Sequence, residues 1–302
     1  MYYYDPRWGG WRYSHTAPRP FLPDYAANVH PGLPASPLSG FASAVGKEAP
    51  AVAASGSDQG TDGDQRAVRA GKAGDIVVIC INGRSGMNSP GISKLRDTLY
   101  IRLSPLGVPA RNVFRRSWNQ NEDGNPLGAP WIWDLNNEIE ERSRKPSYLA
   151  IIGHSYGGWA ACRLSRVTAK IPNYIGLIDP VFGPGNTMNA ADIPKAHMIK
   201  NWYQHNGVTS GNPCTGFGMI PCFPVENGLS CGYQDVPGAQ NMLVRYMRSW
   251  DGTPATVECP GIGEVPVPAT HGNIDDDLWI QRQITEHIVQ DVKKLLYSGS
   301  KR

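Results

Sequence analysis

The sequence has no apolar stretch that approaches the roughly 18 residues needed for a transmembrane helix. Its clearest apolar run, 76–81, has only the length of a strand. Residues 1–25 are aromatic and polar and contain no apolar core of the kind found in a Sec signal peptide. We therefore expect neither a membrane span nor a Sec leader. The expected location is the cytoplasm by default, with export by a dedicated secretion system as the alternative.

The sequence also lacks a strong excess of charge. Its 29 Lys and Arg residues and 26 Asp and Glu residues give a formal net charge of +3, with a pI near 8.5. No run of basic residues is present. Because nucleic-acid binding depends on clustered positive charge, we expect no nucleic-acid partner. The composition leaves the oligomeric state open.

The sequence also lacks the closely spaced cysteine pairs that typically bind zinc. None of the six cysteines forms a Cys-x-x-Cys pair, so we expect no metal ion, and no motif calls for a cofactor. Cys80 and Cys162 lie in apolar patterns and are expected in the core. The other four lie in a Gly- and Pro-rich stretch and indicate two disulfides with three connectivities open: Cys214, Cys222, Cys231 and Cys259. Disulfides would imply an oxidising compartment, and the alternative is four free thiols in a reducing one.

Regular patterning is absent from residues 1–73, which contain eight prolines and many Gly, Ala and Ser residues. This segment is interpreted as an irregular N-terminal arm. Eight aromatic residues fall within 1–25, and we expect them to dock on the domain rather than on a partner. Residues 74–302 are expected to form one catalytic domain, with 206–268 as a loop-rich insertion or cap.

Strands and helices alternate from residue 75 onwards. Apolar, β-branched runs predict strands, and apolar residues at helical spacing predict helices. The expected strands are 76–81, 112–118, 148–152, 174–178 and 198–203, and the expected helices are 90–103, 130–144, 156–169, 240–249 and 275–296. Because the strands are apolar throughout rather than alternating, the fold class is α/β, with a mainly parallel sheet covered by helices on both faces.

One pentapeptide carries the chemistry: Gly153-His154-Ser155-Tyr156-Gly157. It lies between a predicted buried strand and a predicted helix. A serine on such a sharp turn has a strained backbone, so its neighbours must be small, and Gly153 and Gly157 supply that room. The turn exposes the Ser155 hydroxyl and places the Tyr156 amide at a helix N-terminus, where it can stabilise an oxyanion.

This motif and its context resemble the α/β-hydrolase superfamily, and within it the lipases and esterases with a Gly-His-Ser-x-Gly-Gly elbow. The resemblance covers about residues 75–298 and implies an α/β-hydrolase fold with the catalytic order nucleophile, acid, histidine. Asp179, after the strand that follows the elbow helix, matches the acid position of pancreatic-type lipases, with Asp235 as the fallback. His271, just before the last helix, matches the base.

Two other histidines, His205 and His154, compete with His271 for the role of base. His154 is fixed beside the nucleophile and is by resemblance a packing residue, His287 lies within the last predicted helix, and His205 follows a strand. The position of His271 in the chain order favours it.

The resemblance also assigns an oxyanion hole. The loop after the first core strand reads Asn82-Gly83-Arg84, where lipases have His-Gly-x. By this match the backbone amides of Arg84 and Tyr156 would bind the oxyanion, and Gly83 would allow the close approach of the backbone.

These residues together predict a serine hydrolase that cleaves carboxylic esters through an acyl-enzyme. The expected substrate is a small-molecule or lipid ester, including one at a membrane surface. The alternatives are a thioesterase or acyltransferase, and a catalytically silent binding protein with the same fold. Export as a toxin against the phospholipids of a neighbouring cell is a further hypothesis, based on analogy.

Overall fold

The computed structural model describes residues 2–5, 10–13, 72–84, 89–119, 130–222 and 231–297. The compact unit that contains the central sheet comprises Tyr2–Tyr13 and Arg69–Arg302. Within the predicted N-terminal arm, β1 (Tyr2–Asp5) and β2 (Gly10–Tyr13) form an antiparallel hairpin. No periodic pattern in residues 1–73 predicts this hairpin. The rest of the arm, up to residue 71, lies outside the described residues.

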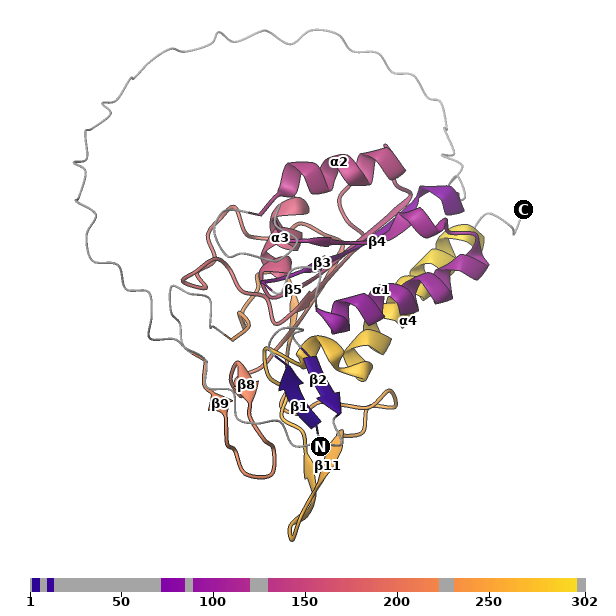
Figure 1. Ribbon diagram of the computed structural model, residues 1–302. Coiled ribbons are helices and arrows are strands. Elements are labelled where there is room, and N and C mark those ends of the chain that lie inside the picture. Colours follow the sequence, from indigo (N-terminus) through magenta and orange to yellow (C-terminus); the bar gives the residue numbers. More distant parts are fainter. Residues whose placement is uncertain are drawn as a thin grey trace, which may run out of the picture. The chain divides into compact units, whose positions relative to one another are not determined.

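The centre of the fold is a six-stranded sheet in the order β10-β7-β6-β5-β3-β4 (Figure 1). Every pairing between these strands is parallel. The expected α/β class with a mainly parallel sheet is therefore confirmed. The strands are β3 (Ile76–Asn82), β4 (Val113–Ser117), β5 (Tyr148–His154), β6 (Tyr174–Ile178), β7 (Met198–Tyr203) and β10 (Gln240–Leu243).

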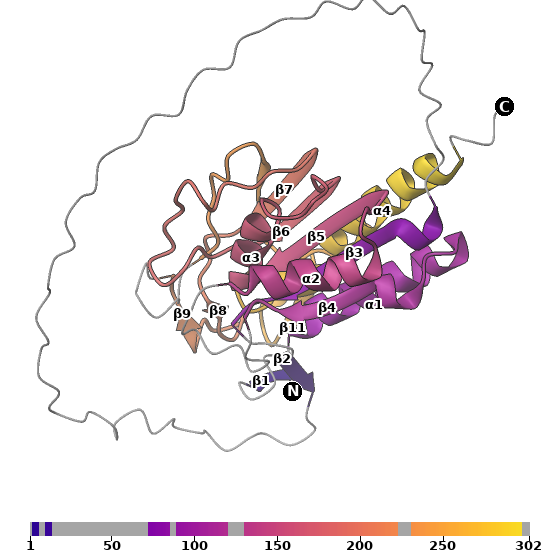
Figure 2. The same cartoon turned by 90° about the horizontal axis from the view of Figure 1, so that it is seen from above.

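Two helices cover each face of the sheet. Helices α1 (Pro90–Leu103) and α4 (Leu278–Tyr297) lie side by side on one face, and α2 (Ile132–Arg142) and α3 (Tyr156–Leu164) lie on the other (Figures 1 and 2). This layering is the one that the α/β-hydrolase fold predicts. It explains why the central strands β3, β5 and β6 are apolar on both sides, since neither face of these strands meets water.

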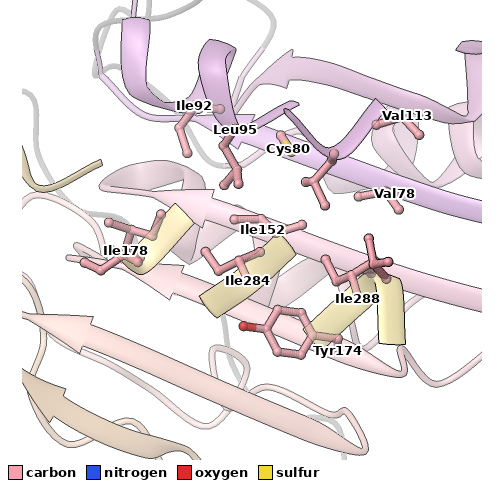
Figure 3. Close-up of a cluster of buried hydrophobic side chains, with 14 of the residues drawn as sticks. Val78, Cys80, Ile92, Leu95, Val113, Ile152, Tyr174, Ile178, Ile284 and Ile288 are labelled. Carbon is pink, nitrogen blue, oxygen red and sulfur yellow. The ribbon is translucent and has the colours of Figure 1, made fainter. Parts of the chain in front are cut away.

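Side chains of strand β3 contribute to the hydrophobic core on both faces of the sheet. Successive side chains in a strand point to opposite faces. Ile76, Val78 and Cys80 pack under α1 and α4, while the residues between them pack under α2 and α3. Figure 3 shows Val78 and Cys80 packed with Ile92 and Leu95 of α1 and with Ile284 and Ile288 of α4.

One predicted helix is wrong. Residues 240–249 were expected to be helical, but 240–243 form the edge strand β10, in which Gln240 lies opposite Lys200 of β7. Met242 and Leu243 favour a helix locally. Pairing with a strand 40 residues away in the chain overrides this preference and satisfies the backbone hydrogen bonds instead.

Two other helices differ from the prediction by at least three residues at one end. Helix α3 ends at Leu164 rather than at 169, and the Ser165 hydroxyl donates to the carbonyl of Cys162 at 2.6 Å, a bond that competes with helical continuation. Helix α4 begins at Leu278 rather than at 275. The Asp277 carboxylate accepts the N–H of Ile280 at 2.8 Å and so caps this helix.

The insertion at 206–268 contains little regular structure besides β10. It holds two short antiparallel pairs, β8 (Thr209–Ser210) with β9 (Met219–Ile220), and β11 (Thr256–Cys259) with β12 (Gly263–Pro266). Disulfides join Cys214 to Cys259 and Cys222 to Cys231, one of the three connectivities that the sequence left open.

The remaining two cysteines, Cys80 and Cys162, are buried in the core. Among the described residues, no helix is both long and apolar enough to cross a membrane.

Candidate active site

Ser155 lies directly after β5 in a backbone conformation that side chains rarely adopt, with φ 58° and ψ −129°. It is 5 % exposed. The turn is sterically possible only with glycines around it. A Cβ at Gly153 would overlap the carbonyl of Gly157, and a Cβ at Gly157 would overlap the carbonyl of Ile81 in the neighbouring strand. The strand, sharp turn and helix that the motif predicted are therefore present.

Gly83, the residue after β3, packs against the serine. A Cβ at Gly83 would lie 2.9 Å from the Ser155 Oγ and 2.7 Å from the carbonyl oxygen of His154. Strands β3 and β5 are neighbours in the sheet, and the chain leaves them in opposite directions across it. Ligands bind at the carboxyl ends of strands at such a point in an α/β sheet. Gly83 thus allows the backbone of this loop to reach the serine.

His271 bridges two residues from different strands. Its Nε2 lies 2.9 Å from Ser155 Oγ, and its Nδ1 lies 2.7 Å from Asp179 Oδ2. The three residues are 24 to 116 positions apart in the chain, and the sheet and the loop before α4 bring them together. The histidine side chain is 13 % exposed, whereas the aspartate is fully buried. This arrangement allows a proton to pass from the hydroxyl to an imidazole that a carboxylate orients.

Asp179 is held firmly at the carboxyl end of β6. It has a positive φ of 46°, and its N–H donates to the carbonyl of Trp202 at 2.7 Å. Gly232 covers the carboxylate so closely that a Cβ at that position would overlap Asp179 Oδ1. Since the carboxylate has no access to water, its charge depends on the hydrogen bonds that it accepts from the protein.

Gln204 supplies most of these bonds, and its role was not found from the sequence. Its main-chain N–H donates to Asp179 Oδ1 at 3.0 Å, and its side-chain amide donates to Oδ2 at 2.8 Å. Its side-chain oxygen Oε1 accepts from the N–H groups of Asn206 and Gly207. The available signal was its position directly after the strand 198–203, one strand beyond the acid, where an amide stands instead of a carboxylate.

The competing acid and bases lie elsewhere. Asp235 and His205 are exposed, and the His205 ring lies against Tyr203. His287 lies on α4, with its Nε2 3.3 Å from Asp291 and its ring against Tyr174. His154 is buried next to the nucleophile, and its ring contacts the backbone of His271.

The residues assigned to the oxyanion hole lie at the same edge of the sheet. Tyr156 is the first residue of α3, and the first N–H groups of a helix have no carbonyl partner within it. Its ring is buried against Trp118 and Trp159. Burial raises the pKa of Tyr156, and the positive charge of Arg84 opposes this shift. The Arg84 side chain is exposed, and residues 85–88 of its loop lie outside the described residues.

The free cysteines are poor alternatives to Ser155 as nucleophiles. Burial raises the pKa of Cys80 to about 12 and raises that of Cys162 as well. The reactive thiolate is therefore scarce at neutral pH. Within the described part of the chain, no three His, Cys, Asp or Glu side chains are grouped so that they could hold a metal ion.

Comparison with known proteins gives only distant structural similarities. No protein-family model matches the sequence, and a search of the curated proteins finds no significant match. A protein from Pectobacterium atrosepticum described as a YdeN-like hydrolase is 12 % identical, with 73 % of this chain and 92 % of that chain covered and a TM-score of 0.38. A pyrethroid hydrolase is 14 % identical, with coverages of 73 % and 98 % and a TM-score of 0.31.

A protein from Xanthomonas campestris assigned to the hydrolases of the alpha/beta superfamily is 16 % identical over 49 % of this chain and 74 % of its own, with a TM-score of 0.29. Similarity at this level does not assign a function. The chemistry must therefore be argued from the geometry of the site.

Proposed function

We propose that the protein is a serine hydrolase that cleaves carboxylic esters through an acyl-enzyme. The observation that carries this proposal is the continuous chain of contacts from Ser155 Oγ through the imidazole of His271 to the buried carboxylate of Asp179. A serine hydroxyl is a weak nucleophile until a neighbouring base can accept its proton. The strained elbow, which holds that hydroxyl next to the base, adds support.

In this mechanism His271 takes the proton of Ser155 as the hydroxyl attacks the acyl carbonyl. Asp179 stabilises the imidazolium that forms, and it remains ionised. The backbone amides of Tyr156 and Arg84 are the proposed donors to the tetrahedral oxyanion. His271 then gives its proton to the departing alcohol, and it activates the water that hydrolyses the acyl-enzyme.

The proposed substrates are small-molecule or lipid esters, including esters presented at a membrane surface. Residues 206–222 contain no Asp, Glu, Lys or Arg, and they expose Phe217 (85 %), Met219 (59 %) and Ile220 (41 %). This uncharged β8–β9 segment is joined to the base, since the N–H of His271 donates to the carbonyl of Gly207 at 3.0 Å. Exposed apolar side chains in a segment that itself carries no charge favour contact with lipid.

Two measurements test the proposal. Turnover of p-nitrophenyl esters of increasing chain length is measured for the wild type and for Ser155→Ala, His271→Ala, Asp179→Asn and Asp235→Asn. The first three substitutions are expected to lower kcat by a factor on the order of 10³ or more, while Asp235→Asn leaves it unchanged. A large loss from Asp235→Asn together with a small one from Asp179→Asn would reverse the assignment of the acid.

Labelling with a fluorophosphonate separates an enzyme from a silent binding protein. Folded wild type is expected to be labelled at Ser155, and Ser155→Ala is not. Thioester substrates and alcohol acceptors are tested in parallel, because a thioesterase or acyltransferase would use the same acyl-enzyme. Absence of labelling in folded protein would favour the binding protein.

A further inference from the structure

His154 has a contact that the proposed reaction does not use. The residue lies directly before the nucleophile at the end of β5, and it is 6 % exposed. Its Nε2 lies 3.0 Å from the main-chain carbonyl oxygen of His271, and the two rings are 5.1 Å apart. Since a carbonyl can only accept, Nε2 must carry the proton and donate it. The elbow histidine is thus bonded to the backbone of the base.

The other side of the His154 ring faces Asp275. Its Nδ1 lies 3.8 Å from Asp275 Oδ2, which is too far for a hydrogen bond but near enough for electrostatic contact. Asp275 is 3 % exposed. It accepts the hydroxyl of Ser89 and, at 3.2 Å, the N–H of Ile92, both at the start of α1. The carboxylate is therefore fixed to a helix N-terminus, which favours negative charge.

The backbone of His271 is held from two sides. Its carbonyl accepts from His154, and its N–H donates to Gly207 of the insertion at 3.0 Å. The next residue, Gly272, donates to Val208, also at 3.0 Å. The imidazole must reach Ser155 and Asp179 at the same time, at 2.9 and 2.7 Å. Such a double contact tolerates little movement of the loop, because a misplacement of about 1 Å can lower a catalytic rate about 100-fold.

We propose that His154 is a positioning residue for His271: its Nε2–H fixes the base loop to the nucleophile elbow. The residue does not touch the reacting atoms, and its effect passes through the main chain of His271. This inference rests on the proposed function only for its effect on the rate. The geometric part, the bond from ring to carbonyl, stands without it.

A matched pair of substitutions tests the inference. In His154→Gln the side-chain amide can occupy the position of Nε2 and keep the donor. In His154→Asn the amide reaches only the position of Nδ1 and cannot reach the carbonyl. We expect His154→Gln to retain the kcat of the wild type within about threefold and His154→Asn to lower it by about 10- to 100-fold. KM is expected to stay within twofold of the wild type for both variants. Melting temperatures identify variants that have lost their fold.

A second readout does not depend on turnover. The Nδ1–H of His271, bonded to Asp179, is expected to give a downfield proton NMR resonance in wild type and in His154→Gln. In His154→Asn this resonance is expected to broaden or move. Equal kcat and equal spectra for His154→Gln and His154→Asn would overturn the proposal. A loss of kcat/KM in His154→Asn that comes entirely from a higher KM would overturn it as well. If wild type turns over no ester, the proposed function fails, while the spectra still decide whether His154 positions His271.

Discussion

Gln204 donates two hydrogen bonds to the carboxylate of Asp179, one from its main-chain N–H and one from its side-chain amide. The carboxylate is fully buried, and its third bond goes to His271. Residue 204 lies at the end of β7, one strand beyond the acid. The strand that follows the acid therefore contributes to the site through an amide, which orients the acid.

Replacing Gln204 with Met removes the side-chain donor and keeps the length of the side chain. A hydrogen bond to a charged group contributes about 1.5 to 3 kcal/mol, so we expect kcat to fall by roughly 10- to 100-fold. KM is expected to change little, because the residue orients the acid and not the substrate. Gln234→Met is the control, since that side chain is exposed. Equal kcat for the two variants would contradict the role of Gln204.

Gly83→Ala is expected to abolish esterase activity. The new Cβ would meet Ser155 Oγ at 2.9 Å and the carbonyl of His154 at 2.7 Å, so the loop or the elbow must shift. Gly74→Ala is the control at the other end of β3, where a Cβ meets no atom within 4 Å. Steady-state rates measure the activity of both variants, and melting curves show whether each variant is folded. Full activity of Gly83→Ala would show that the loop does not approach the serine.

The disulfides and the two buried thiols together predict how many cysteines react with a thiol reagent. Native protein is expected to show no rapidly reacting thiol, because four cysteines are in disulfides and the pKa values of Cys80 and Cys162 are raised by burial. Denatured protein should show two thiols without reductant and six with it. Thiol titration checks these numbers. Four additional thiols in the native protein would contradict the disulfides.

Loss of the Cys214–Cys259 disulfide should destabilise the protein. The bond joins residues 45 positions apart, and a disulfide that closes a loop of this size contributes about 2 to 4 kcal/mol. We expect a matching decrease in the free energy of unfolding for the Cys214→Ser, Cys259→Ser double variant, measured with urea. Because the disulfide lies in the insertion that holds the His271 loop, kcat should decrease as well.

Stability should fall between pH 7.5 and pH 5 in a way that depends on His154. Burial lowers the pKa of this histidine, and the neighbouring charge of His271 acts in the same direction, while Asp275 and Asp179 oppose it. In the unfolded chain the pKa is about 6.5. Below that pH the unfolded chain binds a proton that the folded protein binds less readily, so the free energy of unfolding falls as the pH falls.

The control for the pH effect is His154→Gln, which has no proton to bind at this position. Its free energy of unfolding should fall less than that of the wild type over the same interval, as measured by urea unfolding at each pH. A steeper fall in the variant would mean that the charge of Asp275 outweighs the burial of His154.

The β8–β9 segment should affect lipid binding but not the chemistry. The double variant Phe217→Ser, Met219→Ser is expected to bind phosphatidylcholine vesicles at least tenfold more weakly, since each buried apolar side chain contributes about 1.5 to 3 kcal/mol. Hydrolysis of a soluble short-chain ester should be unchanged. Ile171→Ser, three residues before β6, is a control of similar exposure at 52 %. Equal vesicle binding by the wild type, the double variant and Ile171→Ser would remove the support for a lipid substrate.

The elbow and the core strands could be predicted from the sequence because their requirements are local. Gly153 and Gly157 are close neighbours of Ser155 in the chain, so the small residues that the strained turn requires can be recognised within those five residues. The apolar run of β3 likewise determines by itself that the strand is buried on both faces. Helix 240–249 was predicted wrongly because its local preference was opposed by a partner strand that the local sequence does not contain.

Only the tertiary structure decided which distant residues meet. Four kinds of contact join segments that are far apart in the chain. They are the contact of His271 with Asp179 rather than Asp235, the two bonds from Gln204, the pairing of Cys214 with Cys259, and the bond from His154 to the carbonyl of His271. Such contacts depend on the order of the strands in the sheet and on the course of the insertion. Hydrogen bonds and disulfides need partners within a few ångströms, and only the folded chain brings these partners that close.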